Sequence, residues 1–197
     1  MPTDQLGSGG WERAHESVDT VFQLPAMRVR GSTVQYEDER TRRALAAATD
    51  ETLDESTRFF AGTRLTFDPP LPPGATAVMI APTLKSEARR TFASRLRERG
   101  LVDVARDGSQ QIRVGDRRRA TVTKFAAVNP LDDWDQQLPL ACWVAVWTDT
   151  DSATIVTGGH PTVALASHLG LDTTDEPLRR SGESYREEFF RLLRAVD

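Results

Sequence analysis

The sequence predicts an α+β fold, in which an antiparallel sheet of about seven or eight strands is covered by two to four helices. Most of the predicted strands are joined by turns that are too short for the crossovers that parallel strands need. Each predicted helix carries one apolar stripe, which it can bury against a sheet. A chain of 197 residues is also long enough to bury a core without disulfide or metal staples. We therefore expect an α/β/α sandwich.

The first third of the chain predicts a tail, a hairpin and a helix. Residues 1–10 are polar and glycine-rich, so we expect a flexible tail over 1–16 and a single domain over 17–197. Alternating apolar and polar residues over 17–37 predict a hairpin that turns at Gly31-Ser32. Residues 38–52 are rich in Ala, Arg and Glu, which favour a helix.

The middle of the chain predicts strands on either side of a second helix. Alternation over 57–67 predicts a strand, and the four prolines of 68–74 predict a stiff loop after it. The apolar run 75–81 predicts a short buried strand. A helix over 84–99, capped by Thr83 and ended by Gly100, carries an apolar residue every four positions. A meander is expected over 101–128, with turns at Asp107-Gly108 and Gly115-Asp116.

The last third predicts a further hairpin and a closing helix. Residues 129–139 carry two prolines and three aspartates, which indicate a loop, and 140–148 and 153–157 predict paired strands. Gly158-Gly159 is expected to end the second of these strands, and 162–169 predicts a short helix that ends at Gly170. Ser184 and Glu187 have the spacing of a capping box. The helix after it has one stripe of apolar residues, namely Tyr185, Phe189, Leu192, Leu193 and Val196.

The order of these elements is similar to that of the PsbP and Mog1 group, in which helices cover both faces of a central antiparallel sheet. This resemblance covers residues 18–197 and is one of topology, so it implies the fold and no catalytic residue. The sequence is also rich in Arg and poor in Lys, and Phe59 to Leu65 precede a proline loop. In these respects it resembles uncharacterised domain families of halophilic archaea.

Charge composition bears on the classes of partner. The formal net charge of −4 opposes general affinity for nucleic acid or anionic lipid, and no apolar run is long enough to cross a membrane. Arginine supplies 23 of the 25 basic residues, a bias that either a GC-rich genome or a salt-adapted surface explains. One cluster, Arg117, Arg118 and Arg119, offers an anion-binding site, although a solvated strand edge is the plainer interpretation. We expect weak RNA binding or none, and a cytoplasmic protein.

Catalytic and cofactor motifs are sparse in this sequence. Cys142 lies inside an apolar strand, where a thiol is usually core filling. The three histidines lack the paired spacing of a zinc protease, and no glycine-rich loop has the phosphate-binding pattern. The sequence therefore predicts no metal and no cofactor.

Two classes of function remain open. The first is a non-catalytic domain that binds a partner protein or a small molecule on one face of its sheet. The second is a hydrolase-like enzyme whose site is assembled around His160 from scattered residues, with Asp149, Arg64 and Cys142 as the other residues to test. For either class, the candidate ligand-binding residues are Arg64, Trp143, Trp147 and His160, because an arginine and aromatic rings can line a concavity. A histidine and an acid in one pocket would favour the enzyme.

Overall fold

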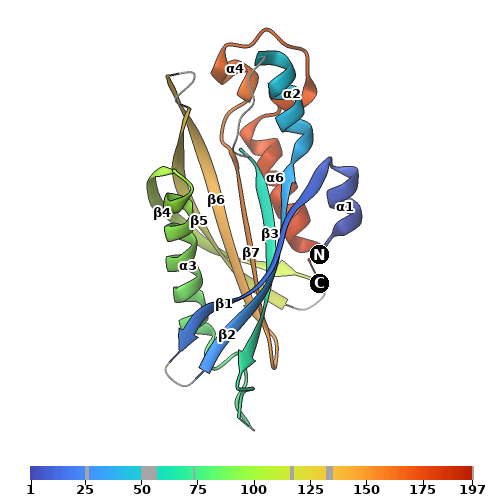
Figure 1. Ribbon diagram of the computed structural model, residues 1–197. Coiled ribbons are helices and arrows are strands. Elements are labelled where there is room, and N and C mark those ends of the chain that lie inside the picture. The colour runs from blue at the N-terminus through green and yellow to red at the C-terminus, as the bar shows by residue number, and fades with distance from the viewer. Residues whose placement is uncertain (25–26, 50–56, 73, 116–117, 132–134, 197) are drawn as a thin grey trace.

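One seven-stranded antiparallel sheet organises the computed structural model, which describes residues 1–24, 27–49, 57–72, 74–115, 118–131 and 135–196 (Figure 1). The strand order is β1-β2-β3-β7-β6-β5-β4, which confirms the predicted fold class. The strands are β1 (Trp11–Leu24), β2 (Met27–Asp38), β3 (Phe59–Asp68), β4 (Val102–Val114), β5 (Arg118–Leu131), β6 (Gln136–Thr148) and β7 (Ala153–Pro161).

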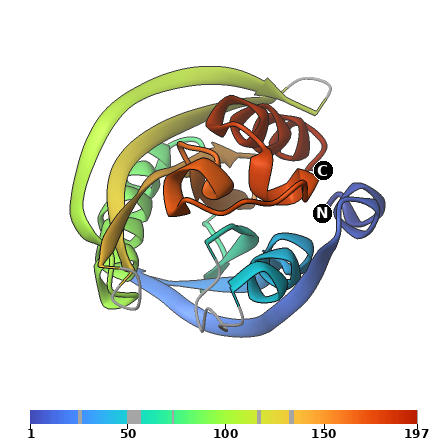
Figure 2. The same cartoon turned by 90° about the horizontal axis from the view of Figure 1, so that it is seen from above.

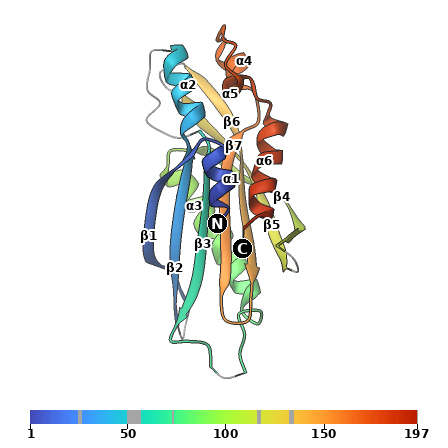
Figure 3. The same ribbon diagram turned by 90° about the vertical axis from the view of Figure 1, so that its right-hand side faces the viewer.

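Helices cover both faces of this sheet. Helix α3 (Ala81–Glu98) packs on one face, whereas α6 (Gly182–Arg194) and the short α1 (Thr3–Ser8) pack on the other (Figures 1 and 3). Helices α2 (Glu39–Thr49), α4 (Leu165–Leu169) and α5 (Glu176–Arg179) gather at one end of the molecule. Viewed from above, the sheet is strongly curved, and β4 and β5 arc around α6 (Figure 2). None of the described helices is long and apolar enough to span a membrane.

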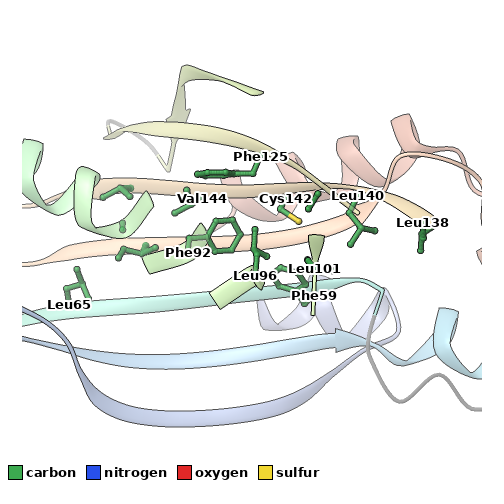
Figure 4. Close-up of a cluster of buried hydrophobic side chains, with 14 of the residues drawn as sticks. Phe59, Leu65, Phe92, Leu96, Leu101, Phe125, Leu138, Leu140, Cys142 and Val144 are labelled. Atoms are coloured by element: carbon green, nitrogen blue, oxygen red, sulfur yellow. The ribbon is translucent and has the colours of Figure 1, made fainter. Parts of the chain in front are cut away.

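Alternation along β6 assigns its side chains to two separate cores. Cys142 and Val144 face α3 and pack among Phe92, Leu96 and Phe125 (Figure 4). Residues of the other parity face α6, where they join Phe189 and Leu193; they are Ala141, Trp143, Ala145 and Trp147. Because helices cover both faces of the sheet, β6 is apolar on both of its faces over residues 138–147.

The two main helices bury the stripes that their spacing predicts. In α3 these residues are Leu84, Ala88, Phe92 and Leu96. All five residues of the second predicted stripe are buried, four of them in α6 and Val196 just after it. The helix starts differ from the prediction. Helix α3 begins at Ala81, before Thr83, with Pro82 in its first turn. The cap of α6 is Ser181, whose hydroxyl accepts a hydrogen bond from the Ser184 backbone N–H at 3.2 Å.

Gly158-Gly159 does not end β7, contrary to the prediction. Strand β7 runs through both glycines. Aromatic rings occupy the space in which side chains at these two positions would lie. A Cβ on Gly158 would lie 2.5 Å from Phe189, and one on Gly159 would lie 2.4 Å from Phe59. Successive residues of a strand point to opposite faces, so each glycine receives a ring from a different layer. The pair is therefore a packing feature of the central strand.

Residues 1–16, expected to form a flexible tail, instead carry α1 and the first part of β1. Leu6 and Trp11 anchor this segment because both are buried in the core beneath α6. The first hairpin also differs from the prediction, as Gly31-Ser32 lies within β2 and the connection lies between Leu24 and Met27. Gly31 is needed there for close packing, because a Cβ would lie 2.3 Å from Val21.

Three further segments differ from the predicted strands and loops. Residues 75–81, predicted to be a strand, instead contain turns over 77–80 and the first residue of α3, Ala81. Asp107-Gly108, a predicted turn, instead lies at a register shift inside β4. The other predicted turn is present, because the β4–β5 connection begins at Gly115. The predicted loop over 129–139 is mostly strand, since β5 extends to Leu131 and β6 begins at Gln136. In the last case pairing with neighbouring strands outweighs the turn preference of Pro130 and Pro139.

Candidate functional site

A cavity of about 480 Å³ opens on the α6 face of the sheet, between the first turns of α6 and strands β4 to β7. Its floor is made of buried side chains from three neighbouring strands, namely Val122 of β5, Ala141 and Trp143 of β6, and His160 of β7. Its rim carries polar residues from β4, β5 and α6, including Asp107, Lys124, Glu183 and Arg186. We call it the Trp143 cavity.

The floor is held in place by a hydrogen bond between two rings. The Trp143 indole N–H donates to Nε2 of His160 at 3.1 Å. An indole nitrogen can only donate, so His160 Nε2 must be the acceptor and Nδ1 carries the proton. Nδ1 lies 2.8 Å from the Pro161 carbonyl oxygen, to which it donates. Trp143 also stacks on Phe189, with ring centroids 5.9 Å apart. The geometry therefore orients the indole in one fixed position.

His160 is neutral in this setting. Burial lowers its pKa to about 4, and the positive charges of Arg58, Lys124 and Arg186 act in the same direction against the hydrogen bond to Pro161. Both ring nitrogens are engaged, so neither is available to take a proton from a substrate. This arrangement suits a positioning role toward Trp143 rather than general-base chemistry.

Charged groups of both signs stand on the rim. The Lys124 ammonium lies 2.6 Å from a carboxylate oxygen of Asp107 and 5.9 Å from the centroid of the Trp143 ring. The Arg186 guanidinium lies over the Phe190 ring, 5.5 Å from its centroid. Such a rim can bind polar or charged groups of a ligand whose apolar part rests on the floor.

The structure brings together only some of the residues that the sequence singled out. Trp143 and His160 are in contact in the cavity floor. Trp147 lies farther along β6, buried in the core beneath α6, and does not line the cavity. Arg64 lies exposed on β3, where it pairs in register with Ser32 and Thr154, and does not line the cavity either.

The other candidates are dispersed. Cys142 faces the α3 core, on the opposite side of the sheet from His160, and burial raises its pKa to about 12. Asp149 forms an ion pair with Arg118 at 3.0 Å, outside the cavity. Arg119 is exposed on the next position of β5, and Arg117 lies outside the described residues. The residues named for a hydrolase-like site therefore do not meet.

Sequence reasoning missed the rim. Asp107 and Lys124 come from the consecutive strands β4 and β5, whereas Glu183 and Arg186 come from α6 near the end of the chain, so only the packing of α6 on the sheet brings the two pairs together. The sequence contained one signal of the rim, because Lys124 is one of two lysines in a chain with 23 arginines and therefore stands out.

A second polar cluster lies buried where α6 meets β1, β2 and the segment before β3. The Arg58 guanidinium lies between the rings of Trp11 and Tyr185, 4.8 and 4.3 Å from their centroids. It forms ion pairs with Asp38 and with Glu188, the latter at 3.1 Å. Glu188 also accepts hydrogen bonds from Arg180 at 2.7 Å and from the Trp11 indole at 3.0 Å. The charges are paired internally, so the cluster joins α6 to the sheet.

The pKa of Glu188 reflects this pairing. Burial raises it, but Arg58, the Trp11 indole and Arg180 outweigh burial and hold the pKa below its ordinary value. The carboxylate is therefore charged in the folded protein at neutral pH.

The neutral state of His160 predicts a pH-dependent stability. Its pKa is about 4 when folded and 6.5 ordinarily, so between these values the unfolded chain binds a proton that the folded protein does not. We expect the unfolding free energy to fall by about 2 kcal/mol from pH 7 to pH 5 for this reason. Urea titrations at both pH values measure the change. His160→Gln should flatten it and His15→Gln, an exposed control, should not; equal slopes in the two variants would contradict the assignment.

Within the described residues, no group of three or more His, Cys, Asp or Glu is placed to hold a metal ion.

Sequence comparisons give the family of this chain. Among curated proteins none has a sequence that matches this one. One family model matches residues 1–197, and it gives no link to the PsbP and Mog1 group or to the haloarchaeal families. The chain therefore belongs to the family described as Domain of unknown function (DUF6517).

Proposed function

We propose that this protein binds a small molecule in the Trp143 cavity. The observation that carries the proposal is a volume of about 480 Å³ above a buried aromatic floor. Ligand sites usually have volumes of roughly 300–1,000 Å³ and combine apolar walls with a few placed polar groups. The cavity meets both criteria, since Trp143 and its neighbours form the floor and Lys124, Asp107, Glu183 and Arg186 stand on the rim.

The chemistry of the lining supports a ligand with a planar apolar group. Such a group can lie in the cavity over Trp143, whose ring is fixed by His160 and Phe189. Rim residues then bind its polar substituents. The hydrogen bonds of His160 support binding over catalysis, because they hold the imidazole as part of the floor.

An NMR titration with 1-anilinonaphthalene-8-sulfonate tests this proposal. The probe carries fused aromatic rings and a sulfonate, which match the floor and the basic groups of the rim. We expect the Trp143 indole N–H signal to shift as the probe is added, whereas that of Trp147, on the same strand but outside the cavity, stays in place. Shifts that spare Trp143 would overturn the proposal.

A pair of tryptophan substitutions provides the matched control. Thr162 is exposed at the mouth of the cavity, and Thr174 is exposed outside it. Thr162→Trp should fill the mouth and weaken probe binding by about tenfold, which corresponds to about 1.4 kcal/mol. Thr174→Trp should leave the affinity unchanged. Equal affinities in the two variants would place the probe elsewhere.

A further inference from the structure

A second cavity, of about 230 Å³, adjoins the first along α6. Gln110 of β4 and Arg186 of α6 line both cavities, so the two share a wall. The second cavity continues between β4 and α6 to Ile112, Phe190 and Arg194. We call it the distal cavity. We call the two adjoining cavities together the groove; both are lined by α6 and by β4, a strand that arcs around α6 (Figure 2).

Close contacts between α6 and the sheet mark both ends of the groove. At the first end, Gly182 approaches Thr162 so closely that a Cβ would lie 2.1 Å from the Thr162 carbonyl oxygen. At the other end, the Gly115 backbone N–H donates to the Arg194 carbonyl oxygen at 3.3 Å. Helix α6 rises by about 18 Å between Gly182 and Arg194, at 1.5 Å per residue. A ligand that fills both cavities is therefore long and narrow.

The distal cavity has two cations that a ligand can use. The Arg186 and Arg194 guanidinium groups lie over the same Phe190 ring, 5.5 and 5.9 Å from its centroid. Within the part of the chain that the structure describes, neither is in an ion pair, in contrast to Lys124, which Asp107 neutralises. Glu187 also lines this cavity, so two guanidinium groups face one carboxylate. This balance favours an anionic group.

We propose that the ligand is an elongated aryl-alkyl anion. Resting on the proposed function, this inference places the aromatic group in the Trp143 cavity, the alkyl chain beside Arg186, and the carboxylate or similar anion between Arg186 and Arg194. Guanidinium groups bind carboxylates through paired N–H donors, which would fix the anionic end. Arg194 is then the residue that sets specificity for the charged end.

A series of ω-phenylalkanoates, from phenylacetate to 8-phenyloctanoate, tests this inference on the full chain. Binding is followed by the shift of the Trp143 indole N–H signal. Each acid is compared with its neutral amide, because a longer chain alone increases hydrophobic affinity. We expect the longer acids to bind about tenfold more tightly than their amides, and phenylacetate to show no such preference.

Two arginine variants localise the effect. Arg194→Gln should abolish the preference of the long acids over their amides, and Arg191→Gln, at an exposed position of the same helix outside the distal cavity, should retain it. If the short probes shift the Trp143 signal but the long acids bind no more tightly than their amides, this inference is wrong and the proposed function stands. No Trp143 shift with any probe would overturn both.

Discussion

Replacing Glu188 by alanine is expected to lower the free energy of unfolding by about 3–5 kcal/mol, because the buried Arg58 loses a partner while its charge remains. Arg58 and Glu188 are 3% and 5% exposed, and Glu188 also accepts hydrogen bonds from Arg180 and Trp11. Removing the carboxylate leaves the buried Trp11 indole N–H without its acceptor and deprives Arg58 of one ion-pair partner, whereas Arg180 keeps its ion pair with Glu176. Denaturant titration of the variant at neutral pH measures the loss.

Glu187→Ala is the matched control, because Glu187 is the adjacent residue of α6 and is exposed. It should change stability by less than about 0.5 kcal/mol. A double-mutant cycle with Arg58→Ala should show strong coupling, since the two residues are in direct contact. Independent effects of the two substitutions would contradict the role assigned to the pair.

The same carboxylate predicts a loss of stability in acid. Glu188 has a folded pKa below its ordinary value of 4.5, so its contribution is complete above that value and disappears as the pH falls through the folded pKa. Glu188→Ala should therefore lose stability less steeply below pH 4.5 than the parent protein does.

Replacing Phe189 by alanine is expected to cost about 3–5 kcal/mol of stability. The ring is buried, stacks on Trp143 and packs edge-to-face against Phe60 and Phe190. Its removal leaves a cavity between α6 and the central strands. Thermal and denaturant melts measure the effect, with the exposed Arg191→Ala on the same helix as control. A melting curve that does not change would show that α6 does not pack on the sheet through this face.

Gly158→Ala tests the same contact from the strand. The new methyl group would meet the Phe189 ring, so we expect a cost of about 1–3 kcal/mol from overpacking. With Phe189 already replaced by alanine the contact with the ring is gone and the Phe59 carbonyl oxygen at 3.1 Å is the remaining close neighbour, so the second substitution should cost less. Gly7→Ala, where a Cβ meets nothing within 4 Å, is the control.

The sequence was most informative where one helix face or strand parity decided burial. The spacing of Leu84, Ala88, Phe92 and Leu96 predicted the buried face of α3, and the stripe from Tyr185 to Val196 predicted that of α6. Short connections between strands predicted the antiparallel sheet. These features depend on neighbours within a few residues, which a single sequence displays directly.

Local patterns failed where distant contacts decide the structure. Gly158-Gly159 is a turn signal in isolation, but Phe189 and Phe59 need the space that the two glycines leave. Residues 1–16 are polar overall, yet Leu6 and Trp11 bury themselves under a helix from the other end of the chain. In each case the partner lies too far along the sequence for a local pattern to reveal it.

The candidate site was predictable only in its floor. Trp143 and His160 stood out as an aromatic in an apolar strand and a histidine between glycine and proline, and the structure places them in contact. The rim depends on β4, β5 and α6 meeting, and the distal cavity depends on α6 lying beside β4. Neither feature can be predicted from a local sequence pattern.

The central place of β7 in the sheet has a consequence for how the chain folds as it is synthesised. Strand β3 pairs with β7, and the two are separated by the whole of α3, β4, β5 and β6. At the usual pace of translation, β3 therefore leaves the ribosome several seconds before β7 does. During that interval the edge of β3 that β7 will cover has no partner strand, and an unpaired strand edge is a surface on which other chains can pair.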